Sequence, residues 1–180
     1  IFNDGTLTMT NATISGNYTS STGGGVCNGE NGSATLRSCT LTENGAGFGG
    51  GVFVGFLNTG EFFRLRSTIV SGNSNSGESP DNIATFESEG SSKAPISATF
   101  CLIGTSTLGS FSGVNNITEV DDPMLGELQA NGGPTLTHLP LSGSPVINKG
   151  NNPALQTRDQ RGLNFYRVRG GRADIGAVEV

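Results

Sequence analysis

The carboxylate and basic side chains that could cleave a polysaccharide are few in this chain, and their spacing does not suit that reaction. Glycoside hydrolysis uses two carboxyl groups that face each other across a sugar. Asp121 and Asp122 are adjacent, and adjacent residues of a strand point to opposite faces, so only one of them could face a groove. Arg64 and Arg66 share one face of a predicted strand, without an acidic pair one repeat away. We therefore expect no catalytic residues.

The other signals for chemistry at a site are weak. His138, the only histidine, is interpreted as a structural residue in the string PTLTHLP. The chain has no GxSxG string, P-loop or dinucleotide fingerprint. Three irregularly spaced cysteines, Cys27, Cys39 and Cys101, predict small buried thiols rather than a disulfide framework or a zinc site. We expect no cofactor, with calcium in oxygen-rich loops such as SGESPDN as the less favoured alternative.

The amino-acid composition indicates which kind of secondary structure carries these residues. A chain of 180 residues with 29 glycines, seven prolines and only 14% charged residues predicts one domain of short strands and turns. No apolar run approaches membrane-spanning length, so we expect no membrane span. Residues 1–150 hold 12 acidic and five basic side chains, and the whole chain has a net charge of −5. Such an acidic body disfavours binding to nucleic acid.

An internal repeat decides the fold class. The strings NATISGN (11–17), SCTLTEN (38–44) and TIVSGN (68–73) align at a spacing of 27–29 residues, GGGV recurs at 23–26 and 49–52, and TFCLIG at 99–104 is a weaker fourth copy. Apolar and polar residues alternate within each copy, which indicates strands. The alternation slips at Asn11, which predicts a corner between two strands. An antiparallel sandwich would not explain the period.

We therefore predict an all-β parallel β-helix, a solenoid of four to five coils with about 27–29 residues per coil, and an irregular C-terminal end structure. Equivalent side chains should stack inside the coils. One predicted column holds Ala12, Cys39, Thr68 and Cys101, and a larger one holds Ile14, Leu41, Val70 and Ile103. Four phenylalanines are predicted to be core or coil-packing residues, with ligand binding as the less favoured role: Phe48, Phe53, Phe56 and Phe62.

A column of asparagines should mark one corner of the coils. Asn17, Asn44 and Asn73 each follow the inward apolar residue by three positions. The asparagine side chain has both donor and acceptor atoms, so stacked copies can bond to one another. Asparagine also tolerates the left-handed backbone of a tight corner. We predict that these three residues hold successive coils together.

The last third of the chain differs from the repeats. We assign residues 1–118 to the coils, with loop excursions near 74–95, and residues 119–180 to an end region of the same domain. A solenoid exposes its last coil unless something covers it. We therefore expect the end region to cover that coil and to be held by ion pairs among Asp159, Arg161, Arg172 and Asp174.

The end region resembles a known bacterial family. The string DDPMLGELQANGGPTLTHLPLSGSPVINKG, followed by DQRG and DIGAVE, is similar to the closing motifs of proteins with a choice-of-anchor Q domain. The units GTLTMTNATISGN and GGGV also resemble the coils of that family and, loosely, those of polymorphic outer-membrane adhesins. The resemblance covers nearly the whole chain and implies a right-handed parallel β-helix of the bacterial surface or exterior. Asn148 departs from the family's usual aspartate, and the resemblance leads us to expect an anchor or sorting signal that the sequence up to Val180 does not contain.

Two classes of function follow from this reading. The first is an extracellular or cell-surface structural or adhesive module, with a glycan or another cell-surface molecule as ligand. The alternative is a carbohydrate-binding or carbohydrate-active β-helix whose active coils lie outside this chain. The opening IFNDGTLTMT resembles the interior of a domain, so we expect a processed chain or a fragment. An uncovered first coil would also allow head-to-tail assembly of the chain with itself, as in a fibre.

Overall fold

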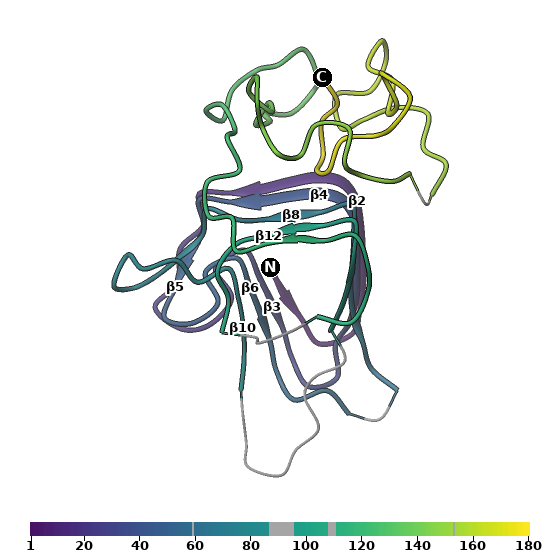
Figure 1. Cartoon of the computed structure of the whole chain (residues 1–180). Coiled ribbons are helices and arrows are strands. Elements are labelled where there is room, and N and C mark those ends of the chain that lie inside the picture. Colours follow the sequence, from purple (N-terminus) through teal and green to yellow (C-terminus); the bar gives the residue numbers. More distant parts are fainter. Residues whose placement is uncertain (59, 87–95, 108–110, 153) are drawn as a thin grey trace.

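The chain forms a stack of parallel strands wound into coils (Figure 1). The structure, a computed structural model, describes residues 1–58, 60–86, 96–107, 111–152 and 154–180, and these contain no helix. The strands are β1 (Phe2–Asn3), β2 (Thr6–Ser15), β3 (Val26–Asn28), β4 (Ser33–Thr42), β5 (Gly45–Ala46), β6 (Val52–Val54), β7 (Phe63–Arg66), β8 (Ile69–Val70), β9 (Ser74–Asn75), β10 (Ile83–Thr85), β11 (Ile96–Thr99), β12 (Leu102–Ile103) and β13 (Ile117–Thr118).

Two larger parallel sheets form the walls of the coils, and a small third sheet lies in the loops beside them (Figure 1). The first has the strand order β1-β3-β6-β10, and the second contains β2, β4, β7, β8, β11, β12 and β13. A third pairs β5 with β9. The predicted parallel β-helix is confirmed, but the strands from β1 to β10 complete about three turns rather than four to five. The difference arises because the chain leaves the coil path after β13.

The predicted inward columns are present. Ile14 pairs in register with Leu41, Leu41 with Val70, and Val70 with Ile103, and all four are buried. In the smaller column Ala12 pairs with Cys39, whose backbone N–H donates to the Thr68 hydroxyl. The hydrophobic core therefore runs through the middle of the stack, as the alternation of apolar residues predicts.

Left-handed residues form the corners. Asn11, Ser38, Ser67 and Phe100 have φ values of 50°, 49°, 47° and 55° and stand at equivalent points, each one turn after the last. The corner predicted at Asn11 is thus confirmed and recurs in each coil. At the corner with the asparagine column the expectation of left-handed asparagines is wrong. The preceding residues take that conformation: Gly16, Glu43 and Gly72, with φ values of 69°, 57° and 71°.

The glycine runs allow the chain to pass close to neighbouring coils. A Cβ atom on Gly25 would lie 2.6 Å from the carbonyl oxygen of Gly51, and one on Gly51 would lie 2.6 Å from that of Asn82. Neither approach is open to a residue with a side chain. The repeated GGGV strings therefore keep adjacent coils at backbone contact distance.

The expectation that the C-terminal region covers the last coil is wrong. Residues 111–118 do so instead, since Ala98 N–H donates to Ser112 O and β13 pairs with β12. The region after residue 119 packs on the outer face of the second sheet, above β2, β4, β8 and β12 in Figure 1. There Ile69 and Leu102, which point away from the coil interior, form a second small core with two residues of the C-terminal region, Val146 and Ile175.

Hydroxyl groups on the same outer face attach the C-terminal region by hydrogen bonds. The Thr40 hydroxyl accepts the backbone N–H of Ala177 at 3.0 Å, and the Thr13 hydroxyl donates to Gln160 Oε1 at 2.6 Å. The solenoid thus carries a small apolar and polar docking face along its side. The reason is local: at these positions the outward residues of the strands are threonine, serine, isoleucine and leucine rather than charged residues.

Candidate functional site

An exposed group of phenylalanines surrounds a cavity on the outer side of the first sheet. β6 points Phe53 outward, because its neighbours Val52 and Val54 both point into the core. Ala84 of β10 lies beside Phe53 in register, and Phe86 directly follows β10. The cavity has a volume of about 350 Å³ and is lined by Phe48, Phe53, Ala84, Thr85, Phe86 and Thr107. We call this the aromatic pocket.

The rings of the aromatic pocket are ordered by contacts with each other. Phe86 meets Phe53 edge to face, with centroids 4.8 Å apart, and lies nearly parallel to Phe56 at 5.8 Å. Phe48 and Phe86 nevertheless expose 61% and 52% of their surface. Among the residues that the structure describes, no lining residue is charged. The pocket is therefore suited to an uncharged apolar group, with the hydroxyls of two threonines as its polar groups.

The prediction that four phenylalanines are core or coil-packing residues is wrong for the two that are exposed. Phe53 is buried, but beneath other aromatic rings rather than inside the coil, whereas Phe48 and Phe56 are exposed and Phe62 is half-buried. The sequence held a signal for Phe48, which stands among glycines in AGFGG and so outside any strand alternation. Nothing in it brings Phe48 next to Phe86, because the two lie on different coils.

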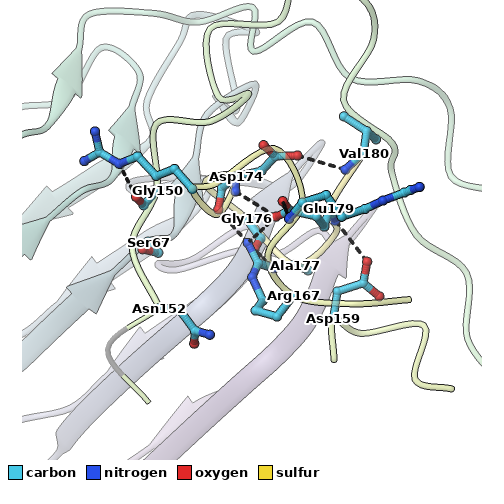
Figure 2. A network of polar contacts seen from close by, with 12 residues as sticks. Ser67, Gly150, Asn152, Asp159, Arg167, Asp174, Gly176, Ala177, Glu179 and Val180 are labelled. Atoms are coloured by element: carbon cyan, nitrogen blue, oxygen red, sulfur yellow. Dashed lines mark hydrogen bonds and ion pairs between the residues drawn. The ribbon is translucent and has the colours of Figure 1, made fainter. Parts of the chain in front are cut away.

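The buried Arg167 is the centre of a second polar site, in the C-terminal region (Figure 2). Its guanidinium donates to the carbonyl oxygens of Gly176 (2.9 Å) and Asp174, and lies 3.7 Å from Glu179 Oε2. The Glu179 carboxylate also accepts the backbone N–H groups of Arg169 and Asp174 at 2.7 and 2.8 Å. One cation and one carboxylate thus hold the turns of the chain's last residues together.

The predicted ion-pair residues contribute unequally to this site. Asp159 and Arg161 form the expected pair, with Arg161 Nη2 2.7 Å from Asp159 Oδ2. Arg172 and Asp174 do not pair. Arg172 Nε donates instead to Gly150 O at 2.9 Å, and its guanidinium lies over the Phe100 ring. Asp174 accepts two backbone N–H groups, from Asn148 at 2.6 Å and Val180 at 2.9 Å.

Sequence reasoning did not single out Arg167 or Glu179. Arg167 is one of five arginines in the last 30 residues, with no local pattern that sets it apart. Glu179 had a usable signal, because it stands between two valines at the end of a buried segment. Burial raises the pKa of Glu179 to about 6 and lowers that of Arg167, while the nearby carboxylates oppose the change at Arg167. This pattern fits a site that organises structure.

The asparagine column is a continuous hydrogen-bonded ladder. Asn17 Nδ2 donates to Asn44 Oδ1 at 2.9 Å, and Asn44 Nδ2 donates to Asn73 Oδ1 at 2.9 Å. The ladder then extends beyond the predicted residues, through Asn82 to the carboxylate of Asp121. Asp121, a candidate acid for catalysis, thus accepts hydrogen bonds at the end of a structural ladder.

The other residues considered for chemistry also have local partners. Asp122 Oδ1 accepts the backbone N–H of Met124 at 2.8 Å. The buried His138 bonds through Nδ1 to Gly126 O at 2.7 Å and through Nε2 to the Ser15 hydroxyl at 2.8 Å. Because a carbonyl oxygen only accepts, Nδ1 carries a proton that it donates to Gly126 O. His138 therefore joins the C-terminal region to β2.

The cysteines are free thiols. Cys39 and Cys101 are buried in the core, and burial raises the pKa of both thiols to about 12. Within the part of the chain that the structure describes, no group of three or more histidine, cysteine, aspartate or glutamate residues could hold a metal ion. The same part contains no helix that is long and apolar enough to cross a membrane.

Comparison with models of known protein families, with curated proteins and with solved structures found no match for this chain.

Proposed function

We propose that this chain is a structural and adhesive module of an extracellular or cell-surface β-helix protein, and that it recognises its ligand through the aromatic pocket. The observation that carries this proposal is the exposure of Phe48 and Phe86 around a cavity on a rigid stack of coils. Contiguous apolar patches on a soluble domain mark interaction sites more often than scattered apolar residues do. The motifs of the end region support the extracellular assignment by their resemblance to bacterial surface proteins.

The carbohydrate-active alternative has less support among the described residues. It requires two carboxylates that face each other across a substrate groove. Asp121 and Asp122 instead accept local hydrogen bonds. Among the described lining residues, a carbohydrate ligand of the aromatic pocket would meet two threonine hydroxyls and no charged side chain. An apolar ring or a branched apolar side chain fits that lining better.

The pocket can be tested with an aromatic probe. The chain contains no tryptophan, so the fluorescence of N-acetyl-tryptophanamide reports its binding without background. We expect saturable binding to the intact chain, and a weakening of about tenfold when Phe48→Ala and Phe86→Ala are combined, since both walls of the cavity are removed. Phe2→Ala is the matched control, because Phe2 is 72% exposed and does not line the aromatic pocket. Equal binding by the double variant and the intact chain would contradict the proposal.

Head-to-tail assembly is a second candidate function, favoured by one feature of the sheet. The ten-residue strand β2 pairs only with β4 among the described residues, so its outer edge presents free backbone groups. Such edges recruit further strands. We propose that β2 accepts a further coil, supplied by a second copy of the chain.

Sedimentation velocity over a range of protein concentrations tests this assembly. We expect concentration-dependent oligomers that are reduced by combining Thr8→Lys with Thr10→Lys, because lysine on an edge strand opposes pairing. Leu155→Lys with Leu163→Lys adds the same charge at exposed positions outside the coils and should leave assembly unchanged. A monomer at every concentration would rule assembly out.

A further inference from the structure

A basic face lies on the second sheet, on the strand segments that precede the left-handed corner at Ser38 and Ser67. The inward residues of β4 and β7 are Leu36, Phe63 and Leu65, so the alternate residues point outward. Those of β7 are Arg64 and Arg66, both exposed. Arg66 pairs in register with Arg37 of β4. We call these three arginines and the outward residues around them the arginine face.

Positive charge is concentrated on this face and is scarce in the rest of the coils. Residues 1–150 contain five basic side chains in total, and three of them are Arg37, Arg64 and Arg66. The face is formed by four adjacent strands, β2, β4, β7 and β11, and none of their outward residues is acidic. The other outward residues are Thr6, Thr8, Thr10, Ser33, Ser97 and Thr99, together with Thr35, which its neighbours bury. A flat surface of hydroxyl and guanidinium groups therefore stands on an otherwise acidic body.

The arginines are placed for binding along the direction in which the coils stack. Arg37 and Arg66 stand on adjacent parallel strands, which are about 4.8 Å apart. Arg64 lies over the ring of Phe62, with its guanidinium carbon 3.7 Å from the ring centroid. This contact orients one guanidinium before a ligand arrives. Arg172 of the C-terminal region lies over Phe100, the corner residue that follows Thr99, and adds a fourth positive charge at the border.

We propose that the arginine face binds an acidic polysaccharide. Arginine pairs with planar or tetrahedral anions through two parallel hydrogen bonds, which suits carboxylate and sulfate groups. The threonine and serine hydroxyls between the arginines suit the hydroxyl groups of sugar rings. A chain of anionic sugars can lie across successive strands and meet one arginine after another. A nucleic acid fits less well, because its dense charge would also meet the acidic surface around this face; the whole chain has a net charge of −5.

This second site goes beyond the adhesive function proposed for the aromatic pocket and uses different residues. Its test is fluorescence anisotropy with labelled polygalacturonate, whose anion is a carboxylate, and labelled dextran sulfate. Labelled neutral dextran and a single-stranded oligonucleotide complete the set. We expect at least one acidic glycan to bind more tightly than the oligonucleotide, no binding of neutral dextran, and weaker binding as salt is added. The stronger of the two acidic probes identifies the preferred anion.

Two double variants distinguish binding at the arginine face from a response to the net charge of the protein. Combining Arg64→Ala with Arg66→Ala should weaken glycan binding by about tenfold or more, because both anion contacts of β7 are lost. Combining Lys149→Ala with Arg169→Ala removes the same charge from exposed residues of the C-terminal region and should change binding less than about twofold. Tryptophanamide binding at the aromatic pocket should be unchanged in both, which shows that each variant is folded and that the two sites are independent.

Three results would overturn the proposal. The first is no binding of either acidic glycan by the intact chain. The second is an equal loss in the two double variants, which would show a response to net charge alone. The third is tighter binding of the oligonucleotide than of both glycans. A failure of tryptophanamide binding with intact glycan binding would count against the aromatic pocket and leave the arginine face standing.

Discussion

Replacing Arg167 with alanine is expected to lower the free energy of unfolding by about 3–5 kcal/mol, the usual result of removing one partner of a buried ion pair. Arg167 is fully buried, so its loss leaves the Glu179 carboxylate without its counter-charge and the carbonyl oxygens of Asp174 and Gly176 without their donor. Urea denaturation measures the change. Limited proteolysis should show that cleavage begins in residues 119–180, because these contacts hold that region together.

The pH dependence of this loss in free energy of unfolding distinguishes two causes. One is an unpaired buried charge on Glu179, and the other is the cavity that the arginine side chain leaves. The folded pKa of Glu179 is raised to about 6, above its ordinary value, and the Arg167 cation acts to lower it. In Arg167→Ala the pKa of Glu179 therefore rises further. At pH 7.5 the carboxylate is charged and uncompensated, whereas at pH 5 it binds a proton and the penalty is relieved. The destabilisation should thus be smaller at pH 5 than at pH 7.5.

Arg169→Ala provides the control for that experiment. Arg169 is exposed, and its contact with Glu179 is made by its backbone N–H, which the substitution keeps. We expect a change of less than about 0.5 kcal/mol. A loss in Arg167→Ala no larger than in this control would show that the buried pair does not hold the C-terminal region in place.

Replacing Asn44 with alanine is expected to destabilise the coils by about 2–4 kcal/mol, since several buried polar groups lose their partners together. Asn44 Nδ2 donates to Ile14 O, Thr42 O and Asn73 Oδ1, and its Oδ1 accepts from Asn17. Asn44→Asp should be as damaging, because a carboxylate keeps the acceptor but has no N–H to donate. Chemical denaturation followed by circular dichroism measures both.

Asn17→Ala is the matched comparison from the same ladder. Asn17 is an exposed member of the ladder, so water can replace the hydrogen bonds that it loses. A change below about 1 kcal/mol is expected. If Asn17→Ala and Asn44→Ala had equal effects, the ladder would contribute through the corner conformation alone and not through its buried hydrogen bonds.

The stacked columns were predictable because a repeat transmits information from one coil to the next. Once Ile14, Leu41 and Val70 are aligned, the register of every strand between them follows, and so does the corner at Asn11. The asparagine ladder follows from the same alignment. Its extension to Asn82 does not, because Asn82 stands only nine residues after Asn73 and enters the ladder after a turn of the chain.

The C-terminal region has no repeat and was less predictable. Its position on the outer face depends on contacts such as Thr40 with Ala177, which join residues 137 positions apart. Arg167 becomes a central residue only when three turns of the chain meet around it. The aromatic pocket is similar, because Phe48 and Phe86 each depend on a neighbour from another coil. Sites made by non-repeating segments leave no periodic trace in the sequence.

The left-handed corner that recurs once per turn also has a consequence for how this fold can change through evolution. Asn11, Ser38, Ser67 and Phe100 are 27, 29 and 33 residues apart, yet each occupies the same point of its coil. The connection that leads into the strand before this corner grows from two residues between β1 and β2, to four between β3 and β4, eight between β6 and β7, and ten between β10 and β11. Doubling a flexible loop adds only about 0.6 kcal/mol to its closure entropy. Insertions and deletions can therefore accumulate along this one edge while strand pairing is inherited unchanged, which makes it the natural place to graft a foreign peptide.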